Sequence, residues 1–285
     1  MRRLKFPLFV SYKLDGWRGG YEVAEFFTRK RLTFPNRNLQ AMFKPIGSQI
    51  SGWDGEVIVG EPFGKGVFSR TDSYCKKHSG TTTLPVRFFV FDNYEAPGEF
   101  WQRIETLHDI SPLVVKLDQT LINSIPELLA FEEEALTLGY EGIILRDPRG
   151  RYKQGRSTLN EQYLVKLKRF SDAEARVVGF EELQHNANAA EKDELGYTKR
   201  SSHAENKLGM GVLGSLVCRV GEVELRIGTG FNAADRRAIW GHRDQYLGRL
   251  AKFKYQTTGA KSSDEGGTGF RPPYVFLGWR SEADA

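Results

Sequence analysis

The chain has 285 residues, of which 40% are hydrophobic and 27% charged, with a formal net charge of +5 and a sequence pI of about 9.1. No apolar run approaches the ~20 residues that a membrane helix requires, so the composition excludes a membrane-spanning helix. Cys75 and Cys218 are too few for a four-thiolate zinc site, and the five histidines show no HxxxH or HExxH spacing. The basic excess suits a polyanionic partner, and any metal should be a hard cation that arrives with phosphates.

The first residues predict a strand that ends at a lysine. Met1–Pro7 is basic, but a proline and a polar motif follow where a signal peptide would have its apolar region, so we expect an intracellular, cytoplasmic protein. Leu8–Tyr12 predicts a short buried strand. Because side chains alternate along a strand, Ser11 and Lys13 should face the same side.

Lys13 begins the stretch Lys13-Leu14-Asp15-Gly16-Trp17-Arg18, in which an acid, a glycine and an arginine closely follow the lysine. A lysine against an apolar floor is costly to charge, so its pKa should fall and its free amine can attack phosphorus. A single lysine at a strand end is usually a solvated side chain. The fixed spacing of Lys-x-Asp-Gly-x-Arg is rare by chance and favours a reactive site.

Two further segments combine strand patterns with charged residues. Residues 21–28 predict a strand that ends at the basic triplet Arg29-Lys30-Arg31. Trp53–Gly60 predicts a tight Asp-Gly turn that leads into an apolar strand. That strand carries Glu56, and an acid in such a strand is costly unless it is paired or faces a cavity. A solvated turn and an edge-strand acid are the simpler interpretations of the triplet and of Glu56.

The middle of the chain predicts a loop, a strand and a helix. Residues 60–83 are rich in Gly, Ser, Thr and Lys and predict a loop with one short helix. Arg87–Asp92 predicts an aromatic strand in which Phe91 immediately precedes an acid. Pro126–Leu138 has helical spacing of apolar residues, and Gly139 suits the helix end.

The helix leads to two more charged strands. Glu141 opens an apolar strand, and Tyr163–Lys168 predicts another. Strand alternation places Lys166 and Lys168 on one face, where the two cations repel each other unless an anion lies between them. An exposed amphipathic strand is the alternative interpretation.

The ordered motifs resemble those of the covalent nucleotidyltransferase superfamily, which contains ATP-dependent DNA ligases, RNA ligases and mRNA-capping guanylyltransferases. The resemblance implies that Lys13 attacks the α-phosphorus of ATP to form lysyl-AMP, with Mg²⁺, or alternatively Mn²⁺, as the metal. The family roles fall on Ser11 at the adenine edge, Phe91 on the adenine face, Arg18 and Glu56 at the ribose, Lys166 and Lys168 on the α-phosphate, Glu141 on the metal, and Arg29 near the 5′-phosphate of a nick.

The pattern changes near residue 171. Residues 1–171 are expected to form an adenylation (nucleotidyltransferase) domain with mostly antiparallel sheets, and residues 172–285 a small OB-fold β-barrel, giving an α+β chain. Strands are predicted at 174–180, 214–220 and 223–229, followed by a basic stretch from Arg236. The turn Gly228-Thr229-Gly230-Phe231 resembles the Gly-Thr-Gly-Phe turn of the ligases.

Two parts of the second domain are candidates for contact with substrate. The polar segment Gln184–Met210 is long for a loop, and we expect it to close over the duplex as a latch. Its candidate phosphate contacts are Lys192, Lys199, Arg200 and Lys207. The C-terminal segment lacks the Arg-x-Asp-Lys motif of cellular ligases and capping enzymes and looks like the end of small phage and bacterial ligases. Arg271 and Arg280 are the candidates for contacting the leaving pyrophosphate.

The sequence thus predicts a minimal ATP-dependent DNA ligase of phage or bacterial type, a monomer that binds ATP and nicked duplex DNA. An RNA ligase or a capping guanylyltransferase would use the same lysine. The missing final motif argues against capping, and the OB-like tail argues against RNA ligation. A noncatalytic OB-fold nucleic-acid-binding protein would place no constraint on Lys13. An NAD-dependent ligase would need additional N-terminal and zinc-bearing domains.

Overall fold

The structure is a computed structural model that describes residues 3–22, 24–256 and 269–280. The chain divides into two compact units, Met1–Arg169 and Phe170–Ala285. The sequence placed the boundary between residues 171 and 172. Within the described residues, no helix is both long enough and apolar enough to cross a membrane.

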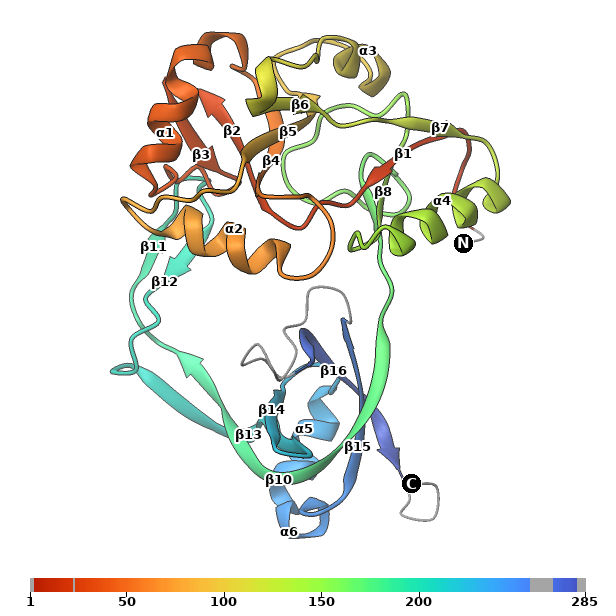
Figure 1. The fold of residues 1–285 in the computed structure, drawn as a ribbon. Helices are drawn as coiled ribbons and strands as arrows, with labels where there is room; N and C mark the ends of the chain where they lie inside the picture. The colour runs from red at the N-terminus through yellow and green to blue at the C-terminus, as the bar shows by residue number, and fades with distance from the viewer. Residues whose placement is uncertain (1–2, 23, 257–268, 281–285) are drawn as a thin grey trace. The chain divides into compact units, whose positions relative to one another are not determined.

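The first unit contains two mostly antiparallel sheets, as expected (Figure 1). The four-stranded sheet has the order β7-β1-β8-β9, and the five-stranded sheet has the order β3-β2-β4-β5-β6, in which β5 and β6 are parallel. The strands are β1 Leu8–Tyr12, β2 Trp17–Glu22, β3 Glu25–Thr28, β4 Trp53–Val59, β5 Val86–Asn93, β6 Val114–Lys116, β7 Thr120–Ile122, β8 Ile143–Arg146 and β9 Val165–Leu167. The helices are α1 Arg37–Phe43, η1 Lys44–Gln49, α2 Val67–Lys76, α3 Phe100–Glu105, η2 Ser111–Leu113 and α4 Ile125–Thr137.

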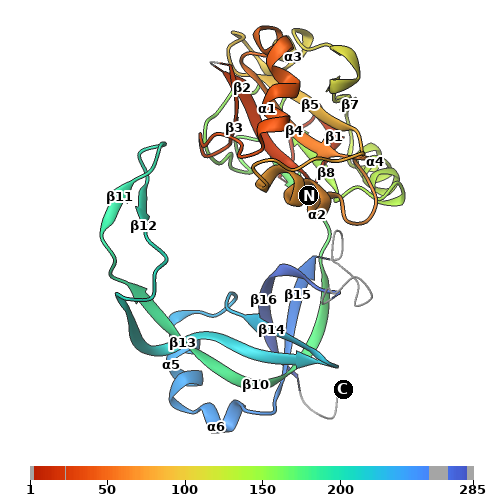
Figure 2. The ribbon, with the colours of Figure 1, turned by 60° about the vertical axis from the view of Figure 1, so that its left-hand side comes forward.

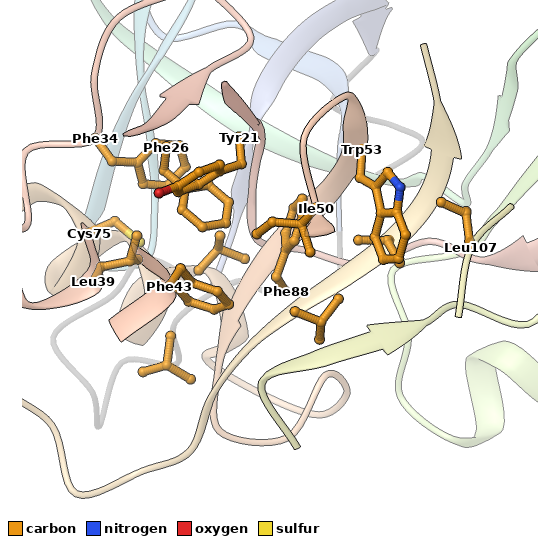
Figure 3. Close-up of a cluster of buried hydrophobic side chains, with 14 of the residues drawn as sticks. Tyr21, Phe26, Phe34, Leu39, Phe43, Ile50, Trp53, Cys75, Phe88 and Leu107 are labelled. Carbon is orange, nitrogen blue, oxygen red and sulfur yellow. The ribbon is translucent and has the colours of Figure 1, made fainter. Parts of the chain in front are cut away.

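The five-stranded sheet packs its inner face into an aromatic core (Figure 3). Phe26 is fully buried at the centre and makes edge-to-face contacts with Phe34, Phe43 and Phe88 at centroid separations of 5.8, 4.8 and 4.9 Å. Such contacts add to the free energy of burying the rings. This core holds the sheet rigidly, so it gives the side chains on the outer face a fixed support.

Tyr21 lies in the same core (Figure 3), and its buried hydroxyl has no hydrogen-bond partner among the residues that the structure describes. A buried, unpaired polar group costs free energy, so we expect Tyr21→Phe to raise the free energy of unfolding by about 1 kcal/mol. Chemical denaturation measures the change. Tyr94→Phe is the control, because the Tyr94 hydroxyl donates to Glu22 and its loss should destabilise the fold. A destabilised Tyr21→Phe variant would contradict the prediction.

Helix α4 confirms the expected start and end signals. The Ser124 side chain accepts the Glu127 N–H at the N-terminus, Pro126 lies in the first turn, and Gly139 adopts φ +90° just after the end. Glycine suits this left-handed position because it has no Cβ to clash. The helix buries Leu128 and Ala135 against the four-stranded sheet.

Two sequence predictions in this unit are wrong. Residues 21–28 do not form one strand, because the chain reverses and pairs Glu22 with Glu25 across the β2–β3 hairpin. Asp54 and Gly55 do not form a turn, because both lie inside β4. A Cβ at Gly55 would lie 2.4 Å from the Phe89 carbonyl oxygen, so the glycine serves close packing of β4 on β5.

The second unit is a five-stranded antiparallel barrel with the order β14-β13-β10-β15-β16. A bridge between Thr229 and Val275 joins the two outer strands, and the Phe276 N–H donates to the Thr229 carbonyl oxygen at 2.9 Å. The elements are β10 Ser171–Asn186, β11 Ala190–Lys192, β12 Thr198–Arg200, β13 Lys207–Val220, β14 Val223–Ile227, α5 Ala233–Gly241, α6 Arg243–Tyr246, β15 Leu250–Gln256 and β16 Arg271–Arg280. This topology agrees with the predicted OB-fold barrel.

The segment Gln184–Met210 is not a structureless loop. Strands β10 and β13 stay paired as far as Asn186 and Lys207, and beyond this point β11 and β12 form a short hairpin (Figure 2). We call the two paired parts of segment 184–210 together the ribbon. The ribbon's side chains are mostly polar and exposed, so the apolar alternation by which strands are recognised is missing. The basic stretch from Arg236 lies in helix α5, whose Arg236 guanidinium donates to the carbonyl oxygens of Leu213 and Gly214.

Candidate active site

A cavity of about 630 Å³ in the first unit is lined by residues from both sheets. On one wall, the register pairs Ser11 with Ile144 and Ile144 with Lys166, so these side chains form a row across β1, β8 and β9. All three line the cavity. Their neighbours Val10 and Leu145 are fully buried on the opposite face. The predicted strand alternation therefore holds.

Lys13 follows β1 directly, and its side chain is 14% exposed. The Lys13 N–H donates to the Gly142 carbonyl oxygen at 2.9 Å, which brings the loop before β8 beside the end of β1. The Lys13 amine donates to the buried Glu141 carboxylate, and Lys168 lies 3.4 Å from the other Glu141 oxygen. The expected apolar floor is wrong, because the amine faces a carboxylate. Lys13, Glu141 and Lys168 nevertheless lie together, as the motifs required.

The other wall comes from the five-stranded sheet, where Arg18 in β2 pairs directly with Glu56 in β4. A Glu56 carboxylate oxygen accepts the Gly16 N–H at 2.8 Å and holds the turn after Lys13. Gly16 leaves no room for a side chain, since a Cβ would lie 2.4 Å from an Ile58 carbon and from the Val57 carbonyl oxygen. The acid in β4 thus has both a backbone partner and a cavity in front of it.

Desolvation raises the pKa of Glu56, although Lys13 and the Gly16 N–H oppose the shift. A carboxyl whose pKa rises on folding stabilises the fold below its unfolded-state pKa, and this contribution is lost as the pH rises through the folded-state pKa. We expect the neutral Glu56→Gln variant to melt at a higher temperature than the wild type at about pH 8 and at the same temperature at about pH 4. Thermal melts at both pH values test this, and a pH-independent difference would contradict it.

Phe91 enters the cavity through a β-bulge. The register shifts where Asp54 pairs with Asp92 while Gly55 pairs with Val90, so Phe91 is the unpaired residue of β5. A bulge re-aims side chains, and here Phe91 lines the nucleotide-sized cavity. The guanidinium groups of Arg18 and Arg146 lie 5.6 and 5.3 Å from its ring centroid. Both cations therefore lie over the ring, at cation–π distance.

Lys166 lines the same cavity. Although its side chain remains exposed, its pKa is lowered, first by desolvation of the amine and then by the nearby cations Lys13 and Arg18. Three cations close together favour an anion between them. This part of the cavity suits a phosphate.

Glu141 could supply a carboxylate to a divalent metal ion here. The described part of the chain contains no group of three or more His, Cys, Asp or Glu side chains that could hold a metal. Glu141 is the acid beside Lys13, and a single carboxylate suits a hard divalent cation that takes its remaining ligands from phosphates and water. The residues therefore fit a metal that arrives with a nucleotide.

A second cavity of about 420 Å³ shares Arg18, Arg29, Arg146 and Lys166 with the first. Arg29 follows β3, and its N–H donates to the Arg18 carbonyl oxygen at 3.3 Å. The remaining wall is the loop 148–159, which contributes the cations Arg151, Lys153 and Arg156. The sequence analysis missed Arg146 and this loop. The clustering of cations after β8 was visible, but it resembles a solvated turn.

Asp92 and two arginines form a buried ion cluster behind the second cavity. Asp92 is 1% exposed and accepts from both Arg103 and Arg146. Arg103 is 2% exposed and also donates to the Gly98 and Gly150 carbonyl oxygens at 2.9 and 3.0 Å. Desolvation lowers the pKa of Arg146, and Asp92 opposes the shift. A buried charge of this kind is tolerated because it is paired and fully hydrogen-bonded.

The predicted residues of the second unit are spread along it. Arg271 begins β16 and Arg280 ends it, and the Arg280 guanidinium donates to Glu174 at 2.8 Å. Ten extended residues span about 30 Å, so the strand separates the two arginines. On the ribbon, Lys192 pairs with Thr198 and Lys199 with Glu191, which places Lys192 and Lys199 on opposite faces.

Comparison with known proteins supplies the family. A family model for the ATP-dependent DNA ligase domain matches residues 1–168. A DNA ligase of Haemophilus influenzae is 25% identical over 256 residues, which cover 87% of this chain and 80% of the relative. A solved structure from a study of DNA binding with a minimal scaffold by Lig E DNA ligases has a TM-score of 0.67 and 26% identity, covering 96% of this chain and 93% of that one. A Chlorella virus DNA ligase-adenylate has a TM-score of 0.51 and 28% identity, covering 99% and 94%.

The fold and the cavity therefore define a nucleotidyltransferase made of an adenylation domain and an OB domain. The chain belongs to the ATP-dependent DNA ligases, and its similarities are to the minimal type. It uses ATP and a divalent metal, binds DNA and seals nicks through a lysyl-AMP intermediate, as its family does. Nick sealing of this kind serves DNA replication and repair.

Proposed function

We propose that Lys13 is the residue that carries AMP and that the 630 Å³ cavity is the ATP site. The observation that supports this is that Lys13 and Lys166 line one cavity, while Glu141 pairs with both Lys13 and Lys168. Incubation with α-labelled ATP, GTP or NAD and a divalent metal, followed by denaturation, tests the nucleotide. An acid-labile covalent label from ATP is expected, and a label from GTP would indicate a capping enzyme instead.

The cavity's residues suggest the binding mode of the nucleotide. The adenine edge meets Ser11, its face stacks on Phe91, and Arg18 with Glu56 contacts the ribose. An aromatic ring open on one side is what stacking on a base requires. The proposed metal is Mg²⁺, with Mn²⁺ as the alternative, and when bound it would neutralise charge on the phosphates.

In the proposed reaction, the Lys13 amine loses its proton and attacks the α-phosphorus, a P–N bond forms, and pyrophosphate leaves. Glu141 orients the amine, and Lys166 and Lys168 stabilise the charge that develops on the α-phosphate. AMP then passes from Lys13 to the 5′-phosphate of the nick. Attack by the 3′-hydroxyl forms the phosphodiester bond and releases AMP.

The second cavity is the proposed site of the 5′-phosphate. Arg29 and Arg156 line it, and it shares Lys166 with the first cavity. Arginine binds phosphate oxygens through two N–H groups in a fixed plane. For the leaving pyrophosphate, Arg271 and Arg280 remain the proposed contacts, and the Arg280 guanidinium also donates to Glu174.

The ribbon of the OB domain is the proposed latch over the duplex. Because Asn186 pairs with Lys207, residues 187–206 can be replaced by a two-residue turn without disturbing the barrel. We expect this deletion to weaken nick affinity at least about tenfold, through lost phosphate contacts, while lysine adenylation continues at the wild-type rate. Gel-shift titration and ATP labelling measure the two quantities, and unchanged nick affinity would contradict the proposal.

The two faces of the ribbon provide a finer version of the same test. Lys192 and Lys199 point to opposite sides, so a duplex that lies against one face contacts only one of them. Lys192→Ala and Lys199→Ala should therefore differ in nick affinity and in its salt dependence. Arg200 is a weaker candidate, because its guanidinium donates to the Asn188 carbonyl oxygen. Lys207 pairs with Asn186, where the pairing of β10 with β13 ends.

The cellular setting is part of the proposal. The similarity to a bacterial and a viral ligase supports a bacterial or phage-encoded enzyme, and we propose that it acts as a monomer in the cytoplasm. Size-exclusion chromatography with light scattering tests the oligomeric state. Offering nicked DNA and nicked RNA duplexes to the labelled enzyme distinguishes DNA ligation from RNA ligation.

A further inference from the structure

Tyr152 is the residue by which the cationic loop of the second cavity contacts the wall of the first. Its hydroxyl donates to the buried Asp54 carboxylate at 2.9 Å. The same carboxylate accepts from the Arg18 guanidinium at 3.0 and 2.5 Å, and the oxygen bonded to Tyr152 is the one that is 2.5 Å from Arg18. Arg18 in turn lies beside the Phe91 ring and lines both cavities.

The loop around Tyr152 has irregular backbone and exposed neighbours, including the cations Arg151, Lys153 and Arg156. Among the described residues, the Tyr152–Asp54 hydrogen bond joins segment 151–156 to an element outside the loop region. Lys153, by contrast, pairs locally with Glu161. The Tyr152 ring also lies 5.7 Å from that of Tyr94 and 5.8 Å from the Arg103 guanidinium. The hydroxyl is therefore one anchor of this loop, beside the Gly150 carbonyl oxygen that accepts from Arg103 at 3.0 Å.

The bond is chemically suited to transmit a change in either direction. A phenol that donates to a carboxylate makes a charge-assisted hydrogen bond, which is stronger than a neutral one. Desolvation and Asp54 both raise the pKa of Tyr152, so it remains a donor. Burial lowers the pKa of Arg18, but Asp54 outweighs this effect and raises it, so the ion pair persists. A nucleotide that orders Arg18 would also order Asp54 and, through it, the loop.

We propose that Tyr152 is a positioning residue that couples the ATP site to the 5′-phosphate site. AMP on Lys13 packs against Phe91 and Arg18, which fixes Asp54 and holds the loop cations in place for the phosphate. Coupling between two sites is reciprocal, so nicked DNA should also favour the adenylated enzyme. This inference rests on the proposed placement of the 5′-phosphate in the second cavity.

The test compares nick affinity of the adenylated and the deadenylated enzyme. Pyrophosphate treatment removes AMP, and EDTA prevents transfer of AMP to the DNA during binding. We expect ATP to label Tyr152→Phe at the wild-type rate. The ratio of nick affinities of the adenylated and deadenylated enzyme should be about fivefold to tenfold smaller in Tyr152→Phe than in the wild type. Tyr246→Phe is the matched control, because Tyr246 lies in α6 and lines neither cavity. An unchanged preference in Tyr152→Phe would overturn the inference.

Arg156→Ala separates this inference from the proposal on which it rests. If the second cavity holds the 5′-phosphate, Arg156→Ala weakens nick binding in both forms of the enzyme. A normal nick affinity in Arg156→Ala would refute the placement itself. Weak binding in Arg156→Ala together with a normal preference in Tyr152→Phe would refute the coupling alone. Wild-type labelling of Tyr152→Phe by ATP verifies that the variant is folded.

Discussion

Lys13→Ala should abolish covalent labelling by ATP and reduce nick sealing with ATP by at least about 1,000-fold. The expectation follows from the role of the amine, which supplies the atom that bonds to phosphorus and cannot be replaced by positioning alone. The nucleotide should still bind, because the walls formed by Phe91, Arg18 and Glu56 are unchanged. Labelling with α-labelled ATP, followed by denaturing electrophoresis, measures the first step directly.

Lys30→Ala is the matched control for this experiment. Lys30 lines the same cavity, but it is exposed and follows β3 rather than β1. Its replacement should leave labelling within a few-fold of the wild type. A third measurement offers the Lys13→Ala enzyme a nick that already carries AMP on its 5′-phosphate. Sealing of that substrate should persist, whereas labelling of Lys13→Ala by ATP would refute the assignment of the nucleophile.

The residues that could be predicted from the sequence belong to short, local patterns. Lys13, Asp15 and Gly16 lie in the short connection between β1 and β2, and Arg18 follows at the start of β2, so their spacing alone indicates a shared site. Glu141 and Lys166 could be predicted because Glu141 lies just before a short apolar strand and Lys166 lies in one, and a charge there is costly unless it is paired or faces a cavity. Strand alternation then assigns Lys166 to the face that carries Ser11, and the register across β8 confirms it.

Other features depend on contacts between distant segments and were missed. Asp54-Gly55 has the composition of a turn, but the packing of Phe88 and Phe89 against Gly55 keeps both residues in a strand. The bulge at Phe91 arises from the register between β4 and β5, to which no local pattern corresponds. Arg103 looks like an ordinary helix cation until the fold places Asp92 beside it.

The ribbon of the OB domain shows a third reason for error. Strands are usually recognised by apolar residues on one face, and this one projects from the barrel with both faces exposed. Its stability comes from backbone hydrogen bonds between β10 and β13, which any polar sequence can make. The length and charge of the segment suggested a functional loop, which stays a prediction, and its strand pairing is seen only in the structure.

Glu141→Ala should slow lysine adenylation on the order of 100-fold, more than any change on the ribose side of the cavity. The Glu141 side chain is 4% exposed and lies between the amines of Lys13 and Lys168. Its removal takes away the carboxylate that orients the nucleophile and the acid available to a divalent metal, so both the rate and the metal requirement should change.

Glu141→Gln separates charge from shape. The glutamine amide fills the same space, and its oxygen can still accept from Lys13. If orientation were the whole role of Glu141, the adenylation rate of Glu141→Gln would therefore stay near that of the wild type. We expect it to resemble Glu141→Ala, with a higher metal concentration needed for half-maximal labelling, because a neutral oxygen is a poorer ligand for a hard cation. Glu134→Gln is the control, since Glu134 is exposed and accepts from Tyr12 rather than from Lys13. A Glu141→Gln enzyme with wild-type rate and metal dependence would restrict Glu141 to holding the lysine in place.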